Sequence, residues 1–366
     1  MGMNSGRGFR LLAGSPHAPF WADVPDFQPR WPWIGGDLQT LRNRLVAPPK
    51  ALWGVERRLL IPLRSPSFGA LSALSNAPFD LAKAKQEKLG ASPIVLMVHG
   101  LGGCEDSAYL RLATLGFEGC GVEVIRLNLR GAGPSAASSS GPYHGGLTDD
   151  LCDVLAWLHA ERPGQPVLAI GFSLGGHMLL RLAGQLGAGE IELEAAHPLA
   201  IMSISAPLDL AAAGARIAAP RNRIYHQALL RWMKRDGAQW APSDDDLQMR
   251  LRAVASIRDF DDRIVAPAHG FRNADDYYYR ASAAHGLSRI RLPVLALHGD
   301  DDPWIPLDAY QAADWPDGGH VQVAISRGGG HVGFHGRQGI LPWYVMVTRK
   351  CVLAHISGAR PGMAVF

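Results

Sequence analysis

One serine of the chain stands in a setting suited to nucleophilic chemistry. Gly171-Phe172-Ser173-Leu174-Gly175 is the only G-x-S-x-G segment, and it lies between an apolar run, Val167–Ile170, and a helical pattern, Leu174–Leu186. A strand, a sharp turn and a helix in this order form a nucleophile elbow. We therefore predict that Ser173 is a nucleophile at a helix N-terminus, where free amides favour a developing negative charge. The alternative is a tight glycine turn that carries an inactive serine.

A serine hydroxyl needs a base, and the base needs an acid to orient it. In the order expected after a nucleophile elbow, the acid comes next and the histidine last. Asp302 is the predicted acid because it follows the apolar run Val294–Leu297 at the usual offset. Its neighbours Asp300 and Asp301 are expected to form the turn. Asp209 is kept as a second candidate, although it also suits the first position of a helix.

The predicted base is a histidine in a glycine-rich loop. Gly328–Gly330 follows the last apolar run, Val321–Ile325, and leads directly into His331. Such a loop lets an imidazole reach over the elbow, where it would remove the proton of Ser173. His335, four residues further on, is the alternative base.

Two backbone amides are expected to stabilise the oxyanion that forms when a serine attacks a carbonyl. One is the amide of Leu174, the residue after the nucleophile. The other is the amide of Leu101 in the loop His99-Gly100-Leu101-Gly102-Gly103, whose glycines let the backbone approach a substrate. This chemistry requires no organic cofactor and no metal ion, and no cysteine pair has metal-ligand spacing.

Short apolar runs alternate with helical patterns through most of the chain, which predicts an α/β fold with a mostly parallel sheet covered by helices on both faces. The predicted strands are Val55–Leu63, Ile94–Val98, Val122–Leu127, Val167–Ile170, Leu199–Ile204, Val294–Leu297 and Val321–Ile325, and the helices between them are Ala108–Glu118, Thr148–Glu161 and Leu174–Leu186. The segment Ser65–Gly90 has no clear pattern.

Three regions follow from this pattern. Residues 1–50 are rich in Pro, Trp and Gly and are expected to form an irregular arm that packs by Trp21, Trp31 and Trp33. Residues 51–207 and 282–366 form the predicted α/β core. Residues 208–281 interrupt the alternation and are expected to form a helical cap insertion, with helices at Arg221–Arg235, stopped by Gly237, and at Leu247–Ile257.

Composition excludes several classes of protein. The 366 residues carry 36 basic and 33 acidic side chains, a net charge of +3, so a nucleic-acid partner is not expected. Four widely spaced cysteines indicate reduced thiols and no disulfide framework. The sequence has neither a signal-peptide pattern nor a membrane-spanning run, so a cytoplasmic protein without an integral membrane segment is expected. The oligomeric state is not predicted.

The chain resembles the YheT-like branch of the α/β-hydrolase superfamily from about residue 31 to residue 335. The resemblance rests on the elbow and on Gly35–Leu41, His99–Gly103, Asn128–Gly133, Tyr143–Asp150, Arg258–Asp262, His269–Phe271, Asp276–Tyr278 and Gly330–Phe334. It implies the α/β-hydrolase fold and the triad Ser173, Asp302 and His331. The family often has histidine where this chain has Asp37. Tyr143, His144 and Tyr277–Tyr279 are expected mainly to pack.

The predicted function is that of a serine esterase or lipase-like enzyme, because known relatives in the family act on carboxylic esters, including lipid esters. An acyltransferase or thioesterase would use the same three residues. A non-catalytic binding module would be marked by a missing triad residue, and none is missing. A membrane-surface lipase rests only on the helix predicted at Arg221–Arg235.

Overall fold

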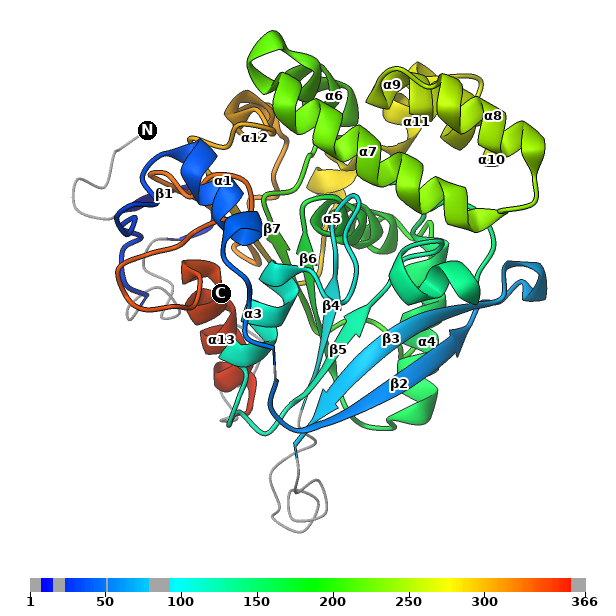
Figure 1. Ribbon diagram of the computed structural model, residues 1–366. Coiled ribbons are helices and arrows are strands. Elements are labelled where there is room, and N and C mark those ends of the chain that lie inside the picture. Colours follow the sequence, from blue (N-terminus) through cyan, green and yellow to red (C-terminus); the bar gives the residue numbers. More distant parts are fainter. Residues whose placement is uncertain (1–7, 16–23, 51, 79–92, 357–366) are drawn as a thin grey trace.

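A computed structural model of the protein describes residues 8–15, 24–50, 52–78 and 93–356. Its centre is a nine-stranded sheet in the order β1-β9-β8-β7-β6-β4-β5-β3-β2 (Figure 1). The six strands from β4 to β9 pair in parallel, and β1, β2 and β3 pair antiparallel at the two edges. The strands are β1 (Phe9–Ala13), β2 (Val55–Pro62), β3 (Ala70–Ala77), β4 (Ile94–Val98), β5 (Glu123–Leu127), β6 (Val167–Phe172), β7 (Ala200–Ile204), β8 (Val294–Gly299) and β9 (Val321–Ser326).

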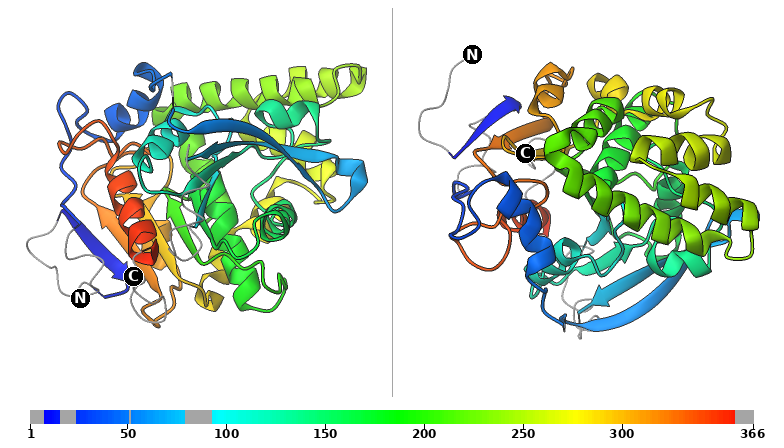
Figure 2. Two further views of the ribbon diagram at one scale, coloured as in Figure 1. Left: turned by 90° about the horizontal axis from the view of Figure 1, so that it is seen from below. Right: turned by 45° about the horizontal axis from the view of Figure 1, so that its top comes forward.

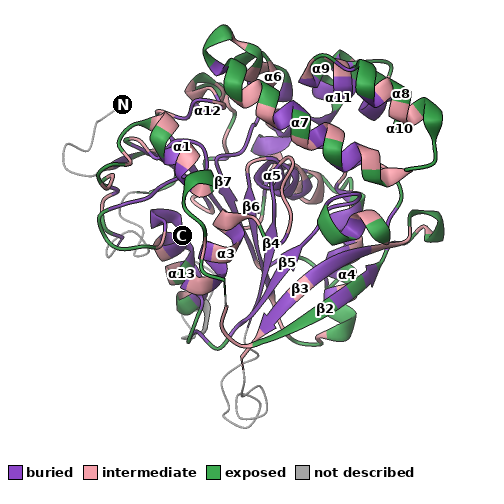
Figure 3. Ribbon diagram, in the orientation of Figure 1, coloured by how far each residue is buried: buried purple, intermediate pink, exposed green. Residues whose placement is uncertain are grey.

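The parallel strands are buried on both faces. Every residue of β4 is fully buried, and its side chains alternate between two separate apolar cores, with Ile94, Leu96 and Val98 in one and Val95 and Met97 in the other. Strands covered on both faces are apolar throughout, which explains the continuous apolar runs. Figure 3 shows the central strands as buried ribbon. The predicted α/β fold class with a mostly parallel sheet is confirmed.

Helices cover both faces of the sheet. Side chains of α3 and α13 join the core on one face, whereas side chains of α4 and α5 join the core on the other. This packing places the N-terminal end of α5, and hence Ser173, at the carboxyl ends of the strands. The helices around the sheet are α1 (Gly36–Leu45), α3 (Ala108–Gly116), α4 (Asp149–Glu161), α5 (Leu174–Gly187), α12 (Leu307–Ala312) and α13 (Trp343–Ile356).

A second group of helices lies between β7 and β8 in sequence and over the carboxyl ends of the strands in space (Figures 1 and 2). We call this group the upper helices. Open α/β sheets bind ligands at that end, so these helices border the expected site. They are α6 (Leu210–Ala218), α7 (Arg223–Trp240), α8 (Asp245–Ala253), α9 (Ile257–Phe260), a π-helical turn (Asp261–Val265), α10 (Ala266–Ala268) and α11 (Ala274–Ala281).

Two predicted helix boundaries in this group are wrong. Gly237 does not stop α7, which continues to Trp240. A Cβ atom at Gly237 would lie 2.9 Å from Leu251 Cδ2, so this glycine allows close packing against α8 and is not a terminator. The second predicted helix ends earlier, at Ala253, because the side chain of Ser256 accepts a hydrogen bond from the Asp259 amide and begins α9.

The first fifty residues are not the irregular arm that their composition suggests. They contain β1, which pairs with β9 at the sheet edge, and α1, which lies beside the site. Trp31 is 81% exposed, whereas Phe27 is buried against Phe334 and Trp343. Trp21 lies outside the described residues. A short edge strand is defined by backbone pairing to a distant partner, which local composition does not encode.

The segment Ser65–Gly90, which had no predicted structure, contains β3. This strand pairs with β2 along its whole length, from Ala70 opposite Pro62 to Ala77 opposite Val55. Its sequence of alanine, serine and leucine lacks the β-branched residues that mark strands.

The four cysteines are free thiols, in agreement with the expectation from their spacing. In the part of the chain that the structure describes, no helix has both the length and the apolar character needed to cross a bilayer.

Candidate active site

The loop that carries Ser173 is held in a strained conformation. Ser173 has φ 52° and ψ −119° between the end of β6 and the start of α5. A Cβ atom at Gly171 would lie 2.4 Å from the Gly175 carbonyl oxygen, and one at Gly175 would lie 2.4 Å from the carbonyl oxygen of Val98. Such distances are far inside van der Waals contact, so both positions require glycine. The turn thus exposes the hydroxyl of a half-buried serine above the sheet.

The structure brings together the three side chains that the sequence singled out. Ser173 Oγ lies 2.9 Å from His331 Nε2, and His331 Nδ1 lies 2.8 Å from Asp302 Oδ2. A carboxylate only accepts hydrogen bonds, so His331 Nδ1 carries the proton and Nε2 accepts from the Ser173 hydroxyl. The chain of hydrogen bonds can therefore pass the serine proton to the imidazole.

Asp302 is buried, and hydrogen bonds from the protein satisfy both of its carboxylate oxygens. Its Oδ1 accepts hydrogen bonds from the backbone amides of Trp304 at 2.8 Å and Ile305 at 3.0 Å, and its Oδ2 faces His331. Burial alone would raise the pKa of Asp302, but the adjacent His331 and these hydrogen bonds outweigh it and hold the pKa below its ordinary value. The carboxylate is therefore ionised at neutral pH.

The loop carrying His331 is fixed by residues from two other parts of the chain, Thr40 and the segment 300–304. The His331 amide donates to Thr40 Oγ1 at 2.8 Å, and the Trp304 ring stacks on the imidazole with centroids 4.3 Å apart. Asp300 and Asp301, expected only to form a turn, accept hydrogen bonds from amides of the glycine loop. Thr40 and Trp304 were not predicted as site residues, although Thr40 lies in one of the family-like segments.

The alternative acid and base lie elsewhere. Asp209 caps α6, where its Oδ1 accepts a 3.0 Å hydrogen bond from the Ala212 amide. His335 is buried, and its Nε2 lies 3.0 Å from Asn43 Oδ1. Burial lowers the pKa of His335 to about 3. Neither residue contacts Ser173 among the hydrogen bonds of the described residues, so Asp302 and His331 are the pair in reach of the serine.

The backbone around Leu101 leaves one amide free toward the site. The amides of Gly100 and Gly102 donate to the hydroxyls of Tyr109 and Tyr143, and the Gly103 amide donates to the Gly100 carbonyl. Within the described ranges, no hydrogen bond occupies the amide of Leu101 or that of Leu174. Both residues line the same cavity as Ser173. Two unoccupied amides beside a nucleophile can bind a developing oxyanion.

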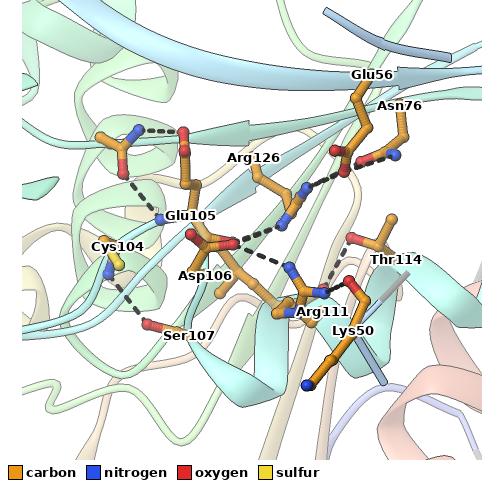
Figure 4. A network of polar contacts seen from close by, with 12 residues as sticks. Lys50, Glu56, Asn76, Cys104, Glu105, Asp106, Ser107, Arg111, Thr114 and Arg126 are labelled. Atoms are coloured by element: carbon orange, nitrogen blue, oxygen red, sulfur yellow. Dashed lines mark hydrogen bonds and ion pairs between the residues drawn. The ribbon is translucent and has the colours of Figure 1, made fainter. Parts of the chain in front are cut away.

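A buried polar network holds the loop that follows Leu101 (Figure 4). The Glu105 carboxylate pairs with Arg58 and accepts a 2.6 Å hydrogen bond from Asn128 Nδ2. The Glu105 amide donates to Asn128 Oδ1, and its carbonyl accepts from Arg126 at 2.8 Å. Arg126 also lies 3.6 Å from Asp106. These bonds tie the loop to β2 and to the end of β5.

His99, at the end of β4, supports the same loop. Its Nε2 accepts a hydrogen bond from the Leu129 amide at 3.1 Å, so its Nδ1 carries the proton and donates to the Gly100 carbonyl at 2.7 Å. Burial lowers the pKa of His99 to about 4, so the ring is neutral. His99 is thus a structural group beneath the site.

Ser173 and His331 open onto an apolar cavity of about 270 Å³ beneath the upper helices. Side chains of α1, α6 and α7 form much of its wall. Its apolar lining includes Leu101, Leu174, Leu210, Ala213, Ile217, Leu229, Trp232, Met233 and Ile305. In the described part of the chain, no group of three or more His, Cys, Asp or Glu side chains could hold a metal ion.

Residues 95–338 match the model of the alpha/beta hydrolase family, and the chain belongs to that family. The YheT protein of Escherichia coli, whose name describes it as a candidate esterase, is 32% identical over 67% of this chain and 71% of its own length. The predicted YheT-like resemblance is thereby confirmed.

Other relatives are longer proteins. Mouse phospholipase ABHD3 is 29% identical over 68% of this chain and 60% of its own length. A monoacylglycerol lipase of Saccharomyces cerevisiae is 28% identical over 69% of this chain and 57% of its own length. The match therefore spans less than two thirds of these two relatives.

Solved structures show the same fold. A Pyrococcus furiosus esterase, Pf2001, superposes with a TM-score of 0.51 at 15% identity, over 86% of this chain and 98% of its own. A 2,6-dihydroxy-pseudo-oxynicotine hydrolase superposes with a TM-score of 0.50 at 17% identity, over 90% of this chain and 74% of its own. At this identity the likeness establishes the fold alone.

Proposed function

We propose that the protein hydrolyses carboxylic esters through an acyl-enzyme on Ser173. The observation that carries the proposal is the continuous chain of hydrogen bonds from Ser173 through His331 to Asp302, at 2.9 and 2.8 Å, at the wall of an apolar cavity. The esterase and lipase names of its relatives agree with this chemistry.

In the proposed reaction, His331 Nε2 takes the proton of Ser173 as Oγ attacks the ester carbonyl. Asp302 holds the Nδ1–H tautomer and stabilises the imidazolium that forms. The amides of Leu101 and Leu174 bind the oxyanion of the tetrahedral intermediate. His331 then protonates the leaving alkoxide, and a water molecule, activated by the same ring, releases the acid and restores the serine. The residues need no cofactor for these steps.

The upper helices are the proposed cap of this enzyme, spanning residues 208–281, on a core of residues 51–207 and 282–366. They supply α6 and α7 to the cavity wall, so they would set which acyl or alcohol groups fit. The apolar lining favours an ester with an apolar part. An acyltransferase or thioesterase with the same triad is the alternative. The four free cysteines favour a reducing compartment such as the cytoplasm.

The test compares the wild-type protein with Ser173→Ala and with Ser140→Ala, an exposed serine in a loop. Hydrolysis of p-nitrophenyl esters of increasing chain length and labelling by a fluorophosphonate probe are measured. We expect turnover and labelling in the wild type and in Ser140→Ala, and loss of both in Ser173→Ala, because a deleted nucleophile leaves little of the rate. A folded wild-type protein that neither hydrolyses nor labels would favour a non-catalytic binding module.

A further inference from the structure

A small second cavity of about 30 Å³ adjoins the large one. Leu101, Leu174, Met233, Asp261 and Tyr277 line both, so the two cavities meet beside the amides proposed to bind the oxyanion. Neither Ser173 nor His331 lines the smaller cavity. We call this smaller cavity the side chamber. A water or hydroxyl group bound in it is away from His331, the proposed base.

The lining of the side chamber is mostly apolar, as in the large cavity, but it includes buried carboxylates. Asp261, in the π-helical turn, is buried, and its Oδ2 accepts a 2.6 Å hydrogen bond from the Tyr278 hydroxyl. Its Oδ1 has no hydrogen-bond donor in the described chain, and no described cation forms an ion pair with it. Burial raises the pKa of Asp261 to about 7. A second buried carboxylate, Asp236 of α7, also lines the chamber.

Two tyrosines also line the side chamber. The Tyr143 hydroxyl accepts from the Gly102 amide at 2.7 Å, and the Tyr277 hydroxyl accepts from the Gly145 amide at 2.9 Å. Each hydroxyl accepts one hydrogen bond from a backbone amide, and its own proton remains available to donate another. No acceptor for either proton is found in the described part of the chain, and both residues line the chamber.

The Asp261 carboxylate and the two tyrosine hydroxyls restrict which functional group of a ligand can bind in the side chamber. A hydroxyl group can donate to Asp261 Oδ1 and also accept from Tyr143 or Tyr277. An ammonium group has no lone pair and would leave the tyrosine protons unmatched, and an apolar group would leave all three polar groups unpaired. The chamber has room for about one or two groups the size of water.

We propose that the side chamber is a hydroxyl-binding subsite and that Asp261 is its specificity-determining residue, so that the substrate is an ester with a free hydroxyl near its carbonyl. This inference rests on the proposed function. Sites that hydrogen-bond a substrate hydroxyl reject the analogue lacking it, because their buried polar groups are then left unpaired. The hydroxyl could belong to the acyl or to the alcohol part, and both are tested below.

The test uses two ester pairs that differ only in hydroxyls: methyl 3-hydroxybutanoate against methyl butanoate, and 2,3-dihydroxypropyl butanoate against propyl butanoate. Hydrolysis is followed by pH-stat in the wild type, Asp261→Leu, Asp261→Asn and the control Asp246→Asn, an exposed acid of α8. In at least one pair, we expect Asp261→Leu to lower the ratio of kcat/KM for the hydroxylated over the plain ester by about tenfold.

Asp261→Asn is a second variant that tests the subsite even if Asp261→Leu does not fold properly. It keeps the side-chain volume and the bond from Tyr278, and it replaces one acceptor with a donor, so it should also lower the ratio. Asp246→Asn should leave the ratio unchanged. An equal ratio in the wild type and both Asp261 variants, for both pairs, would overturn the subsite.

A binding measurement separates the subsite from the proposed reaction. The amides that correspond to the four esters are titrated calorimetrically into Ser173→Ala, with and without Asp261→Leu. A preference for hydroxylated amides that is lost with Asp261→Leu supports the subsite even if the wild type hydrolyses no ester, in which case the proposed function fails alone. Ester turnover with no hydroxyl preference in binding or kinetics removes the subsite alone.

Discussion

Asp301 Oδ1 accepts a 2.8 Å hydrogen bond from the backbone amide of Gly330, the residue before His331. The acid next to Asp302 therefore fixes the loop that carries the imidazole, while Asp302 itself contacts the ring. Two adjacent carboxylates in one turn thus position one histidine through its backbone and through its side chain.

Replacing Asp301 by alanine should lower kcat for a p-nitrophenyl ester about tenfold, because a small displacement of a catalytic group is costly in rate. The free energy of unfolding should fall by about 1 kcal/mol with the lost hydrogen bond. Asp301→Asn keeps an acceptor oxygen and is the matched control. Steady-state kinetics and urea unfolding check both values. Equal loss of kcat in the two variants would contradict a positioning role for the acceptor.

The glycines of the elbow give a sharp stability prediction. Gly171→Ala places a Cβ atom 2.4 Å from the backbone of Gly175, so it should lower the free energy of unfolding by about 3 kcal/mol or more. Gly214→Ala in α6 is the control, since its nearest neighbour would be 3.8 Å away and alanine favours a helix. That variant should be as stable as the wild type or more so by about 0.5–1 kcal/mol. Chemical unfolding measures both, and a mild effect of Gly171→Ala would show that the turn relaxes.

Glu105 and Asp106 are adjacent acids with different expected effects. Glu105→Ala removes the acceptor of the buried Asn128 amide and the partner of Arg58, whose side chain is 42% exposed, and should cost about 1–3 kcal/mol of stability, with a lower kcat as the Leu101 loop loosens. Asp106 is 62% exposed, so Asp106→Ala should cost less than about 1 kcal/mol and leave kcat unchanged. Thermal unfolding and ester kinetics on the same samples make the comparison. Similar losses in the two variants would argue against the buried network as the anchor.

His298 should make stability depend on pH. Burial lowers the pKa of His298 to about 4, whereas an unfolded histidine titrates near 6.5. Between these values the unfolded chain binds a proton that the folded chain does not, so stability falls as pH falls from about 6.5 toward 4. The loss from pH 7 to pH 5 should be about 2 kcal/mol for this ring.

The variant His298→Phe isolates the contribution of His298 to the pH dependence of stability. Neither ring nitrogen of His298 has a hydrogen-bond partner in the described structure, although Nδ1 lies 3.9 Å from Asp302 Oδ2, and the ring stacks on Tyr310 at 4.2 Å, so phenylalanine can replace it. His298→Phe should remove about 2 kcal/mol from the difference in unfolding free energy between pH 7 and pH 5, as measured in urea. An unchanged difference would mean that the ring is already protonated, or equally neutral, in both states.

Much of the fold could be predicted from the sequence. Most of the runs that became β4 to β9 are apolar on both faces, although β5 contains Glu123 and Arg126, and the helices between them repeat every three to four residues, so a parallel sheet with two helical layers follows. The edge strands could not be predicted in the same way. The small residues of β3 and the short β1 become strands only because β2 and β9 pair with them.

The candidate active site likewise contains residues that could be predicted from the sequence and residues that could not. The order of Ser173, Asp302 and His331, each after an apolar run, was enough to predict that these three side chains meet, because the carboxyl ends of parallel strands lie at one edge of the sheet. Thr40 and Trp304, which hold His331, could not be named, because each reaches it from a segment far away in sequence or by ring stacking.

The local features of the candidate site follow from the sequence: a strained turn that requires two glycines, the proposed nucleophile on that turn, and the proposed acid and base in the expected order. The surroundings of these residues follow only from the folded chain. Tyr143 and Tyr277 were expected to pack, and they are buried, but their hydroxyls also accept hydrogen bonds from backbone amides, and both residues line the chamber that Asp261 lines. Side chains that meet across more than a hundred residues leave no periodic pattern in the chain, so only the folded arrangement defines the groups they form.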